Sequence, residues 1–453
     1  MKKRKRGVSL GTVVMILITL AVSAGCFMIM PKLSGGQTVQ VDAQQVVSAL
    51  TQDLNLPQLR LADIPIFQGR KIQATVTPSA PPLEMETLPL STPQVINPVT
   101  AAPTATPAPQ EISFTITAGG TVSLTAPIRK SAYHAESDTY DFSELLSFLS
   151  GETTSDLCML TLENTLDDAS KLSDVNLMAQ ASESLLALGV DLVSLGFPKA
   201  LDTGLPALVN TLAALRQEGF SVIGAYTSQA DAQKPLILNL KGAQVAVLHY
   251  TEDLSSKGDA AAKKNDAAYA VPLLMIETVQ RDIAVARQNG AQVVILSLNW
   301  GSLDKTAPTK AQKSLAQQLA DAGADVILGA HSQTIQPVEY LTATWADGST
   351  HQTLVAYSLG ALMTESRDTK NIAGMLLHLG LTYHPQTGQV SFDRVEYTPT
   401  YIWRYKEDGQ YQYRTVASDQ PAPEDMDESQ QKVMARILNF AHEALETSPI
   451  EMR

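Results

Sequence analysis

Apolar and polar positions change their pattern twice along the 453 residues of this chain. Residues 7–30 are one continuous apolar segment without a charge, and residues 31–110 show little periodicity. From Glu111 onward, apolar runs of strand length alternate with amphipathic segments of helix length. This alternation is typical of an α/β fold with buried sheets, and it places the main domain at residues 111–400.

The elements of this domain follow from the same pattern. We expect strands at 112–118, 157–162, 191–195, 221–223, 293–298 and 326–328, and a hairpin of 236–240 with 244–249. We expect helices at 142–149, 181–188, 205–218, 274–288 and 310–322. From Val338 onward the chain is strand-rich, at 354–357, 375–382 and 390–397, which suits a second, more antiparallel sheet.

Residues 401–453 are treated as a C-terminal hairpin and helix. Residues 403–414 predict an exposed hairpin, because Asp408-Gly409 is a strong turn signal. An acidic loop follows, and residues 428–446 carry apolar side chains at helical spacing. The polar face of that helix has mixed charge, which favours a packing helix over one that lies on a membrane.

The N-terminus predicts a membrane anchor. Residues 1–6 hold five cations and form a short cytoplasmic tail ahead of the apolar segment 7–30. That segment is long enough to span a bilayer, which needs roughly 20 residues. An uncleaved signal anchor, cleavage after Ala24, and a lipoprotein signal at Cys26 are alternatives, and each exports the body of the chain. We therefore expect a single-pass protein of the cell membrane with an extracellular body.

Composition predicts a tether between the apolar segment and the domain, and it also limits the kinds of partner. Residues 31–110, rich in Pro and Thr toward their end, predict a semi-rigid extracellular tether, either a stand-off from the cell wall or a plain linker. The net charge is −13, and the chain beyond residue 6 holds 28 basic and 46 acidic residues, a net charge of −18. Such an acidic body argues against a nucleic-acid partner. The two cysteines, Cys26 and Cys158, are not expected to pair.

The segment from Ser194 to Gly204 reads SLGFPKALDTG. It resembles SLANNHALDYG, the signature of the poly-γ-glutamate capsule-synthesis (CapA/PgsA-like) proteins, whose fold is related to the calcineurin-like metallophosphoesterases. The resemblance covers residues 112–382 and implies an α/β two-sheet sandwich flanked by helices. Phe197, Pro198 and Lys199 stand where the family has Asn-Asn-His, and these side chains cannot replace metal ligands.

The other family motifs are also depleted of ligands. Gly120 replaces the expected Asp after the first strand, and Ala361 replaces an Asn. The remnants are Glu163 in Thr-Leu-Glu, Asn299 in place of a His, and His331 as one of three histidines. Hard cations such as Mn²⁺ or Mg²⁺ need several ligands in fixed geometry. The resemblance thus implies a degenerate site, in which we expect neither a catalytic residue nor a resident metal.

Five further residues have open interpretations. Asp202 precedes the predicted helix 205–218 and is expected to cap it, the alternative being a polar site residue. Lys199 is a candidate substitute for the lost metal charge, paired with Glu163. His249 and Glu252-Asp253 follow a predicted strand and suit the same rim, although no family motif matches them.

The leading hypothesis is a non-catalytic surface protein. By resemblance, it assists synthesis or export of an anionic polymer such as poly-γ-glutamate, by binding the polymer or other envelope-synthesis proteins. The alternative is a divergent metal-dependent hydrolase with a site rebuilt from Glu163, Asp202, Asn299 and His331, using a divalent metal such as Mn or Mg. A surface protein with a purely structural role is a third reading.

Overall fold

The computed structural model describes residues 110–345 and 348–453. The expected cytoplasmic tail (1–6), anchor (7–30) and tether (31–110) lie outside the described residues, apart from residue 110. Within the described part, none of the helices combines the length and the apolar character needed to cross a membrane.

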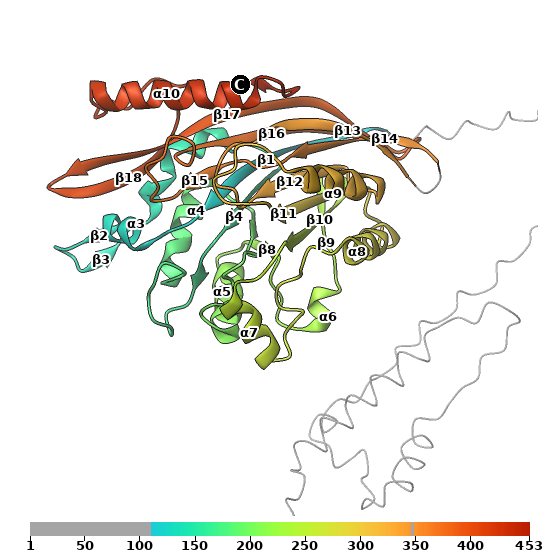
Figure 1. Ribbon diagram of the computed structural model, residues 1–453, viewed down its shortest axis with the longest axis horizontal. Coiled ribbons are helices and arrows are strands. Elements are labelled where there is room, and N and C mark those ends of the chain that lie inside the picture. Colours follow the sequence, from blue (N-terminus) through green and yellow to red (C-terminus); the bar gives the residue numbers. More distant parts are fainter. Residues whose placement is uncertain (1–109, 346–347) are drawn as a thin grey trace, which may run out of the picture. The chain divides into compact units, whose positions relative to one another are not determined.

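The larger of two main sheets contains nine strands, among them both the first strand and the last strands of the domain in sequence order (Figure 1). Its path runs β18-β17-β16-β1-β4-β7-β8, parallel from β1 to β8 and antiparallel from β1 to β18. The short strands β15 (Ala361–Met363) and β19 (Glu451–Met452) pair with β1 and β17. The path strands are β1 (Ile112–Val122), β4 (Leu157–Leu162), β7 (Leu192–Ser194), β8 (Ser221–Ile223), β16 (Ala373–His384), β17 (Gln389–Glu407) and β18 (Gln410–Ala417).

The second sheet has six strands in the order β13-β14-β12-β11-β10-β9. They are β9 (Leu236–Leu240), β10 (Ala243–Thr251), β11 (Val293–Asn299), β12 (Val326–Ala330), β13 (Val338–Thr344) and β14 (Thr350–Ala356). The two sheets share one buried core, in which Ile116 and Leu160 of the first belong with Ile295 of the second. Two small ribbons complete the strands: β2 (Tyr133–His134) with β3 (Thr139–Tyr140), and β5 (Thr165–Leu166) with β6 (Asn176–Leu177).

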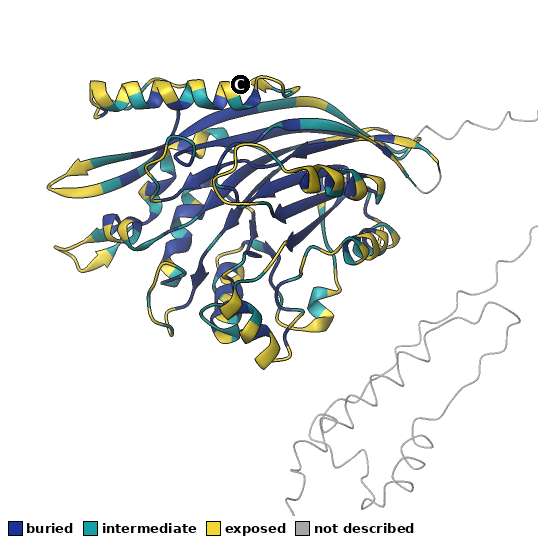
Figure 2. Cartoon of the chain, in the orientation of Figure 1, coloured by how far each residue is buried: buried dark blue, intermediate teal, exposed yellow. Residues whose placement is uncertain are grey.

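Helices cover the outer faces. A second core joins Val279 of α8 (Ile276–Gln288) and Leu319 of α9 (Lys310–Asp321) to Val294 of the six-stranded sheet. Helix α10 (Glu428–Leu445) lies along β16 and β17, with its exposed side facing solvent (Figures 1 and 2). The remaining helices are α3 (Ala126–Ser131), α4 (Glu183–Leu188), α5 (Leu205–Gln217), α6 (Gln229–Ala232) and α7 (Ser256–Lys264), with 3₁₀ turns at η3 (Ser143–Leu145), η4 (Ser147–Glu152) and η5 (Ala179–Ser182).

The α/β class is confirmed, and three expectations about its parts were wrong. The segment 142–149 forms 3₁₀ turns with bonds such as Leu149 N to Leu146 O (3.0 Å), rather than an α-helix. The later strands do not form a sheet of their own: β13 and β14 join the six-stranded sheet, and β16 extends the first sheet beside β1. The hairpin after residue 400 is only partly exposed, because Trp403 and Tyr413 are buried.

The end of the domain is continuous with the main sheet. Strand β17 passes through residue 400, where the sequence placed the boundary to the C-terminal hairpin. Its predicted turn is present, since Asp408 and Gly409 have φ of 48° and 79°.

Candidate functional site

Three of the predicted site residues meet at the carboxyl ends of strands from both sheets. Glu163 follows β4, Asn299 ends β11, and His331 follows β12. The Asn299 Nδ2 donates a hydrogen bond to Glu163 Oε1 at 2.9 Å. The His331 Nδ1 lies 3.9 Å from the same oxygen, within reach of an ion pair but beyond a hydrogen bond. Sandwich formation thus brings together side chains that are far apart in sequence.

Two polar atoms of this site lack partners. In the part of the chain that the structure describes, Asn299 Oδ1 and His331 Nδ1 are buried without a hydrogen bond. Burial lowers the pKa of His331, but attraction to Glu163, with smaller contributions from Asp253 and Glu252, outweighs it and leaves that pKa raised. His331 also adopts a φ of 92°, a strained backbone conformation for a residue with a side chain.

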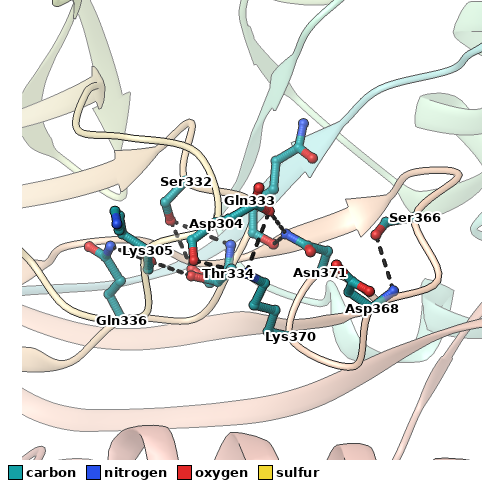
Figure 3. Close-up of polar contacts among 10 residues, drawn as sticks. All are labelled: Asp304, Lys305, Ser332, Gln333, Thr334, Gln336, Ser366, Asp368, Lys370 and Asn371. Atoms are coloured by element: carbon teal, nitrogen blue, oxygen red, sulfur yellow. Dashed lines mark hydrogen bonds and ion pairs between the residues drawn. The ribbon is translucent and has the colours of Figure 1, made fainter.

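Neighbouring loops hold the backbone after His331 in place (Figure 3). Asp304 N donates to Ser332 O at 2.9 Å, and Asn371 Nδ2 donates to Asp304 Oδ1 at 2.9 Å and to Gln333 O at 3.3 Å. Sequence reasoning missed Asp304 and Asn371, because they lie in polar loops without a period or a motif. They are positioning residues for the loop that carries His331.

Asp202 does not join the other three. Ser255 Oγ donates to Asp202 Oδ1, while the same Oγ accepts from Gly258 N at 2.9 Å and caps α7. The expected cap was therefore wrong: α5 begins after Gly204 without a side-chain cap. The tight turn before it, with Asp202 N bonded to Lys199 O at 2.9 Å, precedes the helix, and the carboxylate contacts α7 instead.

Residues 197–199 stand where the family has Asn-Asn-His, and they contribute packing and backbone contacts instead of metal ligands. Phe197 is 2% exposed and belongs to the main core. Pro198 O accepts a hydrogen bond from Ser255 N at 2.7 Å. Lys199 is exposed, and among residues 110–345 and 348–453 it forms no ion pair with Glu163, so the expected pairing was wrong.

The remaining donors do not fit the two-metal centre that the family resemblance implies. A Cβ at Gly120 would lie 2.3 Å from Gly360 O, so the backbone leaves no room for a ligand side chain there. Within the described residues, no three His, Cys, Asp or Glu side chains group as they would around a metal ion. Glu163, Asn299 and His331 are thus too few for a binuclear site, and no metal-dependent step follows from them.

His249 lies beneath this site and not on its rim, contrary to expectation. Its Nε2 donates to Gly196 O at 2.7 Å, so its Nδ1 accepts from Ser297 Oγ at 3.0 Å, and Ser297 Oγ accepts from Ser194 Oγ at 3.0 Å. Full burial lowers the pKa of His249 to about 4. Glu252 does lie at the exposed rim, where its Oε2 accepts from Gly301 N at 2.6 Å.

Two curated proteins from Bacillus species are similar to this chain in sequence. The chain is 27% identical over 248 residues to the PGA biosynthesis protein CapA of Bacillus subtilis (strain 168), covering 53% of this chain and 56% of that protein. It is 24% identical over 214 residues to the capsule biosynthesis protein CapA of Bacillus anthracis, covering 46% and 49%. The matched region spans about half the length of these curated relatives.

Solved structures with a related arrangement are more distant. A calcineurin-like phosphoesterase, YfkN from Bacillus subtilis, is 12% identical with a TM-score of 0.36, covering 74% of this chain and 99% of that one. A phosphatase from Mycoplasma pneumoniae is 11% identical with a TM-score of 0.35, covering 64% and 94%. These scores are too low to carry a functional argument.

The family of this chain is shown by a match to a sequence model and not by these solved structures. The sequence model of the family described as bacterial capsule synthesis protein PGA_cap matches residues 115–366, which is more than half of the chain. The strand ends that carry Glu163, Asn299 and His331 fall within these residues. This chain belongs to the bacterial capsule synthesis protein PGA_cap family.

Proposed function

We propose that this protein is a membrane-anchored, extracellular member of its family that binds or scaffolds an anionic polymer of the poly-γ-glutamate type during synthesis or export, without catalysing a reaction. One observation carries the non-catalytic part. The strand-end site retains only Glu163, Asn299 and His331, while the Gly360 carbonyl fills the space of a first-strand ligand at Gly120. Relatives named for capsule and PGA biosynthesis support the polymer.

The anchor and location rest on the sequence. Residues 7–30 are apolar and follow a basic cluster, an order that predicts the N-terminus inside and the body outside. Protease treatment of intact cells tests this, with detection of a tag placed after Arg453. Loss of the tagged full-length band from intact cells supports the orientation. A body that stays protected until the cells are lysed contradicts it.

The central experiment combines binding and turnover. The full-length chain in a non-ionic detergent is assayed for binding to fluorescent poly-γ-glutamate, and for phosphomonoesterase and phosphodiesterase activity with Mn²⁺ and Mg²⁺. A variant with Glu163→Gln and His331→Gln runs alongside. We expect binding in both proteins and turnover in neither. Metal-dependent turnover that disappears in the variant would overturn the non-catalytic role.

A second candidate function has a specific observation in its favour. Asn299 Oδ1 and His331 Nδ1 are buried beside Glu163 and lack hydrogen-bond partners in the described part, a state typical of sites that meet a ligand. A hydrolase built on these residues would account for it. The turnover assay above separates the two functions, because a binding protein gives no signal that depends on Glu163 and His331.

A further inference from the structure

A cleft opens where the signature segment ends, away from the contacts of the strand-end site. It has a volume of about 540 Å³, and its walls are the loop 170–173, the turn 201–204 and helix α7. This volume lies within the usual range of ligand pockets, roughly 300–1,000 Å³. Leu201, Thr203 and Gly204 of the signature line it. The second half of the signature therefore shapes a cleft, while its first half packs into the core.

Two lysines from different segments line this cleft. Lys171 comes from the loop and Lys257 from α7, and both are exposed. Neither forms an ion pair with any described residue. Arg129 of α3 donates to Ser173 O at 3.2 Å, which brings a third cation against the same loop. The cleft therefore offers positive charge that no carboxylate of the described chain neutralises by direct contact.

Two carboxylates of the segments that form this cleft already accept hydrogen bonds. Asp202, which lines the cleft, accepts from Ser255 Oγ. Asp174, next to Ser173, accepts from Ala126 N at 2.9 Å. Hydroxyl groups at Ser170 and Thr203 also line the walls. An incoming anion would thus meet the two ammonium groups and the Thr203 hydroxyl, which outnumber the Asp202 carboxylate in the lining.

This cleft matters for polymer binding because the rest of the body is acidic. Beyond residue 6 the chain has 28 basic and 46 acidic residues, so it repels a polyanion at long range. Recognition of such a polymer requires a local surface where positive charge prevails and where contact is closer than the Debye length, about 8 Å at physiological salt. The unpaired Lys171 and Lys257 supply that surface.

We propose that this cleft binds the free α-carboxylates of the γ-linked anionic polymer, with Lys171 and Lys257 pairing to separate carboxylates and the Thr203 hydroxyl donating to one of them. This rests on the proposed function and adds the place of binding. Lysine ammonium groups pair with carboxylates and phosphates alike, so the choice of carboxylates rests on the proposed polymer and is tested against polyphosphate below.

The test measures binding of fluorescein-labelled poly-γ-glutamate to the full-length chain in non-ionic detergent by fluorescence anisotropy. The variant carries Lys171→Gln and Lys257→Gln. The control carries Lys310→Gln and Lys432→Gln, which make the same change in net charge at exposed positions outside the cleft. We expect the cleft variant to weaken binding about tenfold and the control less than about twofold. Circular dichroism melting verifies that both variants fold.

The outcomes separate this inference from the function on which it rests. If the wild-type chain does not bind the polymer, the proposed function itself fails. If it binds, and the two variants weaken binding equally or not at all, the polymer binds elsewhere and the cleft is excluded. A polyphosphate arm tests the chemistry: binding of polyphosphate in preference to poly-γ-glutamate, lost in the cleft variant, would overturn the choice of carboxylates.

Discussion

Two histidines of the six-stranded sheet, His249 on β10 and His331 directly after β12, have opposite surroundings. His249 pairs in register with Ser297 on β11, and His331 contacts the site formed with Asn299, two residues further along that strand. Both ring nitrogens of His249 have partners, and burial lowers its pKa to about 4. His331 has a buried Nδ1 without a hydrogen-bond partner in the described part, a strained φ, and a raised pKa.

The difference separates a histidine whose ring is fully hydrogen-bonded from one whose buried Nδ1 lacks a hydrogen bond. The ring of His249 fits a space that glycines leave: a Cβ at Gly196 or Gly224 would come within 2.5 Å of it. Its Nε2 bond to Gly196 O joins the two sheets, from β10 to the second residue after β7. His331 has no comparable support from its own ring contacts, and the surrounding loops hold its backbone. Satisfied polar groups stabilise a fold, whereas unsatisfied ones mark strain or function.

The largest expected effect comes from closing the space around His249. Gly224→Ala should lower the free energy of unfolding by about 3 kcal/mol, because the new Cβ meets a buried ring and a backbone φ of 78°. Gly219→Ala is the matched control, since its φ is 96° but nothing lies within 4 Å, and about 1 kcal/mol is expected. Urea denaturation measures both. Equal losses would show that the ring packing contributes nothing.

Removal of the His249 ring is expected to have the second-largest effect on the free energy of unfolding. His249→Gln should cost about 2 kcal/mol, because Ser297 Oγ and Gly196 O lose well-placed partners in the core. His331→Gln should change stability by less than about 1 kcal/mol, since its Nδ1 has no hydrogen bond to lose. The same denaturation experiment compares the two. A larger loss at His331 would reverse the assignment of roles.

The effect of pH on His249 is smaller and has a definite sign. Because its pKa falls from about 6.5 to about 4 on folding, the unfolded state binds more protons between these values, and stability decreases as pH falls through this window. His378, whose pKa also falls to about 4, adds a similar dependence. We expect the destabilisation caused by His249→Gln to shrink from pH 7 to pH 4. A destabilisation that is constant with pH would contradict the buried neutral ring.

The smallest effect concerns the pKa of His331. Glu163→Gln should lower it, because attraction to that carboxylate raises it most strongly. Glu252→Gln is the matched control and should lower it less, since Glu252 contributes least among the carboxylates that raise it. NMR titration of the imidazole Cε1 proton measures both. An equal shift in the two variants would mean that Glu163 is not the partner of His331.

Prediction from sequence succeeded where structure is local. Strands β4 and β8 and the β9–β10 hairpin have the expected bounds within a few residues, because short apolar runs and a Lys241-Gly242 turn specify them directly. Prediction failed for the sheet to which the later strands belong. The pairing of β16 with β1 joins residues more than 250 positions apart, as between Ile112 and Tyr383. Nothing in a local pattern states which edge of which sheet a strand will join.

For the candidate site too, some properties follow from the sequence and others only from the tertiary structure. The sequence alone determined that ligands are missing, because Gly120, Phe197 and Lys199 cannot coordinate a metal in any fold. The tertiary structure alone decided that Glu163, Asn299 and His331 meet, that Asp202 contacts Ser255 instead, and that His249 is buried beneath them. The reason is physical: residue type fixes what a side chain can bind, whereas its distance from others depends on how two sheets pack around one core.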